Sequence, residues 1–152
     1  MTWETYHTQS ERYAISAELA GKARDFVHAK QLYELAAAQE ESALAALDPQ
    51  ETRGLGIFAV SACALWYKAG AYDRAKELAL SQLRTNLLPP FAEDQLRELL
   101  AEVERTTELL AAMKEWQASL SLSPADRDRL AKAVQEWKTA TAEAAPVYQA
   151  TA

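Results

Sequence analysis

Two histidines and one cysteine are the residues whose types could suggest catalysis or metal binding. His7 and His28 each lie three residues after an acid, at Glu4 and Asp25. An acid and a histidine at this spacing share a helix face, which is how di-iron helical bundles present their ligands. Such a site also needs two carboxylates from other helices, and residues 52–69 are almost wholly apolar. We therefore predict no metal site and expect both histidines to be solvated.

Cys63 is the only cysteine, so an internal disulfide is excluded. A nucleophilic cysteine needs a histidine or a cation beside it to lower its pKa, and no histidine is near it in sequence. The flanking residues 61–65 are small or apolar, which favours a structural role in the core.

Arg53-Gly54-Leu55-Gly56 could offer backbone N–H groups and an arginine to an anion at a helix start. The segment lacks the glycine spacing and the lysine of a P-loop, and no strand precedes it. A flexible helix entry is the favoured interpretation. No other group of residues indicates catalysis, so we predict a protein that is not an enzyme and has no cofactor.

The elements that would hold these residues are helices. Ala, Leu, Glu and Gln dominate, and only 4 Gly and 5 Pro are present, so helix is favoured nearly everywhere. We predict an all-α fold with about six helices in antiparallel hairpins. The predicted helices cover residues 10–21, 25–47, 52–69, 72–85, 91–120 and about 124–145.

The helix over residues 52–69 is predicted to be central, because it has almost no polar face before Lys68. Gly70 then ends it, since glycine adopts the left-handed cap conformation without steric cost. The chain divides into an N-terminal extension (1–9), a single helical domain (10–145) and a frayed C-terminal tail (146–152).

Charge and hydropathy exclude several classes of partner. The net charge is −6, and residues 1–50 carry eight acidic against four basic residues. Without a cluster of lysines and arginines, neither nucleic acid nor an anionic membrane is an expected partner. No apolar run is long enough to span a bilayer, and no secretory signal is visible, so we expect a cytoplasmic protein.

Two segments of the sequence are similar at an offset of 46 residues: residues 29–32 align with residues 75–78. The pattern that leads into the second copy is a glycine turn at Gly70, followed by an aromatic residue at Tyr72 and a small residue at Ala75. This pattern resembles the turn within tetratricopeptide repeats (TPR). The resemblance covers residues 57–89 best, with Trp66 at the family's aromatic position. The 46-residue offset exceeds the family's 34, so an ordinary helical bundle is the alternative.

The resemblance implies a concave face that binds a partner protein or peptide, as an adaptor or accessory subunit. We expect Tyr67 and Lys68 to anchor that partner, with Lys68 selecting an acidic segment. The remaining groove positions that the family implies are Val60, Glu11, Glu18, Lys22, Arg97, Glu104 and Arg105.

Two further functions stay open. The acidic N-terminal third and the small size are compatible with an inhibitory or immunity-type subunit that holds an enzyme or toxin inactive. A helical bundle that binds a small ligand or metal in its interior is the other alternative. The sequence also leaves a homo-oligomer open.

Overall fold

The computed structural model describes residues 1–120 and 122–143, and nearly all of them lie in helices. Across these two ranges the chain forms six α-helices and no strand, which confirms the predicted all-α class. The helices are α1 (Trp3–Lys22), α2 (Phe26–Ala45), α3 (Thr52–Lys68), α4 (Tyr72–Leu83), α5 (Pro90–Ser119) and α6 (Pro124–Glu143). Within the described ranges, no helix is both long and apolar enough to cross a membrane.

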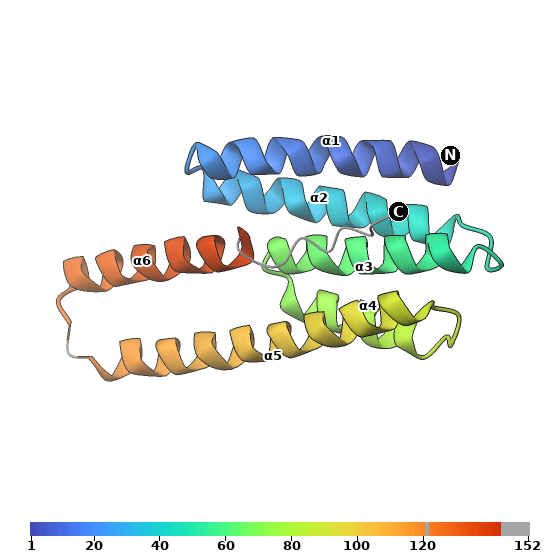
Figure 1. Ribbon diagram of the computed structural model, residues 1–152. Helices are drawn as coiled ribbons and strands as arrows, with labels where there is room; N and C mark the ends of the chain where they lie inside the picture. The colour runs from blue at the N-terminus through green and yellow to red at the C-terminus, as the bar shows by residue number, and fades with distance from the viewer. Residues whose placement is uncertain (121, 144–152) are drawn as a thin grey trace.

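The helices pack as successive antiparallel neighbours (Figure 1). α1 and α2 form the first hairpin, and α3 and α4 form the second. α5 packs against both α3 and α4 and then extends beyond them. α6 returns antiparallel to α5, so that its C-terminal end meets the C-terminal end of α3 (Figure 1).

α1 begins at Trp3, seven residues earlier than predicted, so most of the predicted N-terminal extension is helical. Tertiary packing explains the difference. The Trp3 ring makes an edge contact with Phe58 of α3, with ring centroids 5.5 Å apart, and Tyr6 packs against the same core. The predicted C-terminal tail, residues 146–152, lies outside the described residues.

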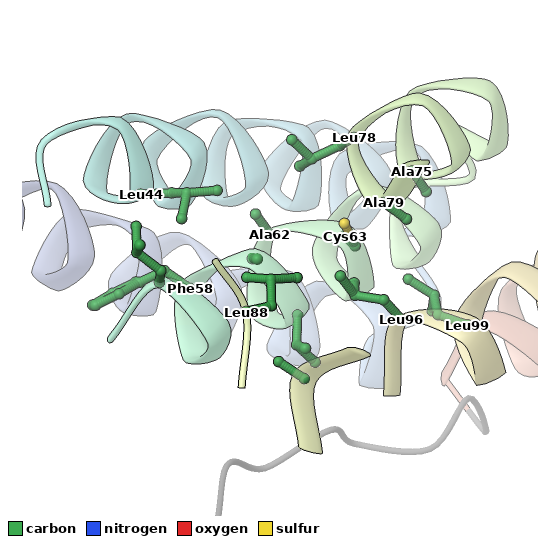
Figure 2. Close-up of a cluster of buried hydrophobic side chains, with 14 of the residues drawn as sticks. Leu44, Phe58, Ala62, Cys63, Ala75, Leu78, Ala79, Leu88, Leu96 and Leu99 are labelled. Atoms are coloured by element: carbon green, nitrogen blue, oxygen red, sulfur yellow. The ribbon is translucent and has the colours of Figure 1, made fainter. Parts of the chain in front are cut away.

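α3 is the central helix, as predicted from its apolar sequence. It packs against α2, α4, α5 and α6. Figure 2 shows side chains from α2, α3, α4 and α5 meeting in one core around Ala62 and Cys63. The buried residues of α3 are Leu55, Gly56, Phe58, Ala59, Val60, Ala62, Cys63, Leu65 and Tyr67.

Small residues allow α3 and the start of α5 to approach closely. A Cβ atom at Gly56 would lie 2.8 Å from the Pro89 ring and 2.9 Å from the Ala92 side chain, closer than real Cβ contacts. Gly56 is therefore required for packing. This replaces the interpretation of Arg53-Gly54-Leu55-Gly56 as a flexible helix entry.

The first two hairpins turn through the same hydrogen-bonded motif. After α3, the Gly70 N–H donates to the Tyr67 carbonyl at 2.9 Å and the Ala71 N–H to the Trp66 carbonyl at 3.0 Å. After α1, the Arg24 N–H donates to the Gly21 carbonyl and the Asp25 N–H to the Ala20 carbonyl, both at 2.9 Å. These are Schellman caps, and their left-handed residues are 46 positions apart, at Arg24 (φ 61°) and Gly70 (φ 74°).

Gly70 and Arg24 offer a matched test of this turn. Gly70→Val is expected to lower the free energy of unfolding by roughly 1–2 kcal/mol, because a branched side chain resists the left-handed conformation, and Gly70→Asn by less. Arg24→Gly is expected to cost nothing, because relief of the same strain offsets the added freedom of the unfolded chain. Urea unfolding followed by circular dichroism measures all three. Equal losses for Gly70→Val and Gly70→Asn would contradict the role of the turn.

Candidate functional site

Two of the nine residues predicted to contact a partner lie in the core. Tyr67 is 0% exposed and Val60 is 2% exposed. The Tyr67 hydroxyl lies 2.9 Å from the Thr106 hydroxyl and donates to Glu102 Oε1 at 3.4 Å. Both of those residues belong to α5. The predictions of Tyr67 as an anchor and of Val60 as a groove position are therefore wrong.

The long helix α5 is the reason for this error, because it covers the face of α3 that carries both residues. The stripe of α3 that remains partly accessible lies on a different side of the helix from the face that α5 covers. It consists of four half-buried residues: Ile57, Ser61, Ala64 and Lys68. These residues follow one another at helical spacing, and two of them are small. Of the predicted contact residues on α3, only Lys68 belongs to this stripe.

The other six predicted contact residues are exposed, three on α1 and three on α5: Glu11, Glu18, Lys22, Arg97, Glu104 and Arg105. α1 and α5 lie at opposite edges of the stack, so these residues do not gather around one point (Figure 1). Two of them are also engaged within α5, because Arg97 pairs with Glu93 at 2.9 Å and Arg105 pairs with Glu102. Their contact with a partner stays a prediction.

Lys68 belongs instead to a place where four helices meet, which we call the four-helix junction. The junction consists of Glu18 of α1, Tyr33 of α2, Lys68 of α3 and Glu143 of α6. The Lys68 ammonium lies over the Tyr33 ring, 5.6 Å from its centroid, within range of a cation–π contact. Burial, and then the carboxylates of Glu18 and Glu143, raise the pKa of Tyr33 to about 12. The aromatic partner of Lys68 is therefore Tyr33 rather than the neighbouring Tyr67.

A cavity of ≈ 80 Å³ opens at this junction, between the N-terminal end of α2 and the C-terminal ends of α3 and α6. Such a volume accommodates several water molecules or a small polyatomic group. Three lysines line it, one from each of these helices: Lys30, Lys68 and Lys138. We call it the lysine cavity. Its remaining lining combines Tyr33 and Tyr72 with amide, hydroxyl and small apolar side chains, and with the Glu143 carboxylate.

Two of the helices around this cavity, α2 and α3, are linked to each other and to α4 by a polar network. Glu41 of α2 accepts a hydrogen bond from Trp66 Nε1 of α3 at 3.1 Å and also pairs with Arg74 of α4. The Arg74 guanidinium lies over the Trp66 ring, 5.9 Å from its centroid. One carboxylate thus connects three helices, which holds the C-terminal half of α3 in position.

His7 is only partly solvated, with 34% of its side chain exposed, whereas the prediction was a solvated histidine. Its Nδ1 lies 3.0 Å from Glu40 Oε2, and the Glu40 side chain is only 1% exposed. Its Nε2 lies 3.5 Å from Glu11, and its ring makes an edge contact with Phe58. A usable signal was present in the sequence, because Glu40 falls within the apolar stripe of α2. Its partner could not be identified from the sequence, because the prediction places residues 1–9 in an N-terminal extension outside the helical domain.

His28 and Cys63 behave as predicted. His28 is exposed, and its ring lies 3.7 Å from the Asp25 carboxylate, while Asp25 also caps the start of α2. Cys63 is 0% exposed, and burial raises the pKa of its thiol. Among the residues that the structure describes, no three histidines, cysteines or acids gather as a metal site would require.

No protein-family model, curated protein or solved structure matches this chain.

Proposed function

We propose that the chain is a protein-interaction module, an adaptor or accessory subunit, that binds an acidic segment of a partner protein at the four-helix junction. The observation that carries this proposal is the placement of Lys68. The lysine extends from a helix otherwise committed to the core, stacks over Tyr33 and borders an open cavity. A cation held over an aromatic ring is preorganised, so binding a carboxylate there costs little side-chain freedom.

The arrangement of the helices supports the same function. Stacked helical hairpins present rigid surfaces that extended segments of other proteins can follow. The two equivalent turns at Arg24 and Gly70 favour a repeat of the tetratricopeptide type, with the second copy closer to that pattern. Ala29 and Ala75 occupy the equivalent small positions and are 3% and 0% exposed, which permits close contact within each hairpin.

An acidic stripe favours a second function, inhibition of a basic enzyme or toxin. Glu4, Glu11 and Glu18 follow one another at seven-residue spacing on α1, and all three are exposed. Residues seven apart lie on nearly the same side of a helix, so the three carboxylates form one negative surface. Such a surface would attract and orient a basic partner.

Lys68→Glu tests the first function directly. The variant reverses one charge at a half-buried position, so it should fold normally while repelling an acidic segment. Capture of the partner from a lysate of the source cells, quantified by mass spectrometry, is expected to fall at least about ten-fold. The dissociation constant of the purified partner should rise by a similar factor.

Lys76→Glu is the matched control, because it makes the same charge change on the exposed face of α4. Its capture should equal that of the unaltered chain. Equal capture by the Lys68 and Lys76 variants would contradict the proposed site. Loss of capture only when Glu4, Glu11 and Glu18 are changed to glutamine would instead support inhibition of a basic partner.

A further inference from the structure

Three of the seven lysines in the chain line one cavity, although they come from helices far apart in the sequence. Within the two described ranges, neither Lys30, Lys68 nor Lys138 forms an ion pair with an acidic side chain. Four arginines, by contrast, do form ion pairs with carboxylates: Arg74, Arg97, Arg105 and Arg129. The lysine cavity therefore brings together three ammonium groups that have no ion-pair partner among the described residues.

This concentration is unusual in a chain with a net charge of −6. Like charges brought together repel one another, and the many acids of the chain could have compensated them. Among the described residues that line the cavity, Glu143 is the only acid. It lies against α1, where its Oε1 occupies the space that a Cβ atom at Gly21 would fill. The described part of the lining thus carries three positive charges and one negative charge, an excess of two.

An external anion of matching charge would relieve this excess. A phosphomonoester carries a charge of about −1.5 to −2 at neutral pH and has three strong acceptor oxygens, whereas a single carboxylate carries −1. Lysine ammoniums, the Thr139 hydroxyl and the Gln135 amide supply donors around the cavity. Phe26 and Ala142, also in its lining, provide an apolar surface for the carbon side of the ester.

We propose that the lysine cavity binds a phosphomonoester dianion, held by Lys30, Lys68 and Lys138. The inference deepens the proposed function, on which it rests, by naming the group that the partner presents at the junction. The same chemistry occurs on a phosphorylated side chain of a protein and on a free small phosphate. The first source agrees with a protein-interaction module, and the experiment below separates the two.

The test measures binding to the full chain in phosphate-free buffer by calorimetry and by amide chemical shifts. The probes are inorganic phosphate, O-phospho-L-serine, and a neutral peptide containing phosphoserine, glutamate or serine at one position. The phosphoserine peptide is expected to bind at least about ten-fold tighter than its glutamate and serine counterparts. If O-phospho-L-serine binds as tightly as the phosphopeptide, a small phosphate is the source; if the phosphopeptide binds tighter, a modified protein is the source.

Substitutions that change the charge of the cavity lining are expected to change the affinity for the phosphopeptide in a defined direction. Lys30→Gln, Lys68→Gln and Lys138→Gln should each weaken phosphopeptide binding by about ten-fold. Glu143→Gln should strengthen it, because it removes a negative charge from the lining. Lys76→Gln, outside the cavity, should leave it unchanged. Circular dichroism of each variant confirms that the fold is retained.

Three results would overturn the inference: no saturable binding of any phosphorylated probe, equal binding of the phosphoserine and glutamate peptides, or lysine variants that bind like the unaltered chain. None of these results would remove the proposed function, provided that Lys68→Glu still abolishes capture of the partner. Conversely, tight phosphate binding together with normal capture by Lys68→Glu would refute the proposed function and leave the phosphate site intact.

Discussion

Replacing Tyr67 with alanine is expected to lower the free energy of unfolding by about 4 kcal/mol, the usual range for deleting a packed aromatic side chain. Tyr67 is completely buried at the centre of the stack. Its ring makes an edge contact with Tyr72 of α4, with centroids 5.4 Å apart, and its hydroxyl bonds to α5. One side chain therefore connects three helices, and its loss leaves a cavity that they cannot fill by small movements.

Two companion variants show which part of Tyr67 matters. Tyr67→Phe keeps the ring and should cost about 1–2 kcal/mol, because the buried Thr106 hydroxyl loses its partner. Trp66→Ala should cost less than Tyr67→Ala, since Trp66 is only half-buried and faces Arg74. Urea unfolding curves give all three values. A larger loss for Trp66→Ala than for Tyr67→Ala would mean that α5 does not cover α3 as described.

Replacing His7 with alanine is expected to cost about 3 kcal/mol, because it leaves the buried Glu40 carboxylate without a partner. An uncompensated charge in the core is far more costly than a lost contact on the surface. This outcome reverses the expectation from the sequence, which treated both histidines as solvated. The His7 ring also contacts Phe58, so a smaller part of the loss comes from packing.

His28→Ala provides the matched control, because His28 is exposed and its loss should cost less than about 0.5 kcal/mol. Adding Glu40→Leu to the His7→Ala variant should restore much of the lost stability, because no buried charge then remains. Thermal unfolding at pH 7 and urea titration measure both effects. If His7→Ala and His28→Ala were equally mild, Glu40 would have to be hydrated rather than paired with His7.

Structural features that depend only on residues close together in the sequence could be predicted without the tertiary structure. A helix was predicted from about residue 124, and α6 does begin at Pro124, where the Asp126 N–H donates to the Ser123 hydroxyl at 3.2 Å. The end of α3 was predicted from Gly70, which has the expected positive φ. The central position of α3 followed from a helix that is apolar all round. Capping, backbone conformation and helical periodicity act over a few residues, so they can be predicted from a short segment of the sequence.

The accessible face of α3 could be identified only from the tertiary structure. Tyr67 and Lys68 are adjacent in sequence, yet one is completely buried and the other borders a cavity. The difference arises because α5 packs on one side of α3, while α6 leaves the other side partly open. Periodicity shows that a helix has buried positions, but the direction in which each neighbour approaches depends on the packing of all the helices together.

The same limit applies to charges that meet across the fold. His7 and Glu40 belong to different helices, and Lys30, Lys68 and Lys138 come from three. Apart from Lys68, each looks like an ordinary surface residue in its own segment. Pairing and clustering of such side chains depend on loop lengths and on the register of one helix against another. These are set by the whole core, so no short stretch of sequence contains the lysine cavity or the buried histidine–glutamate pair.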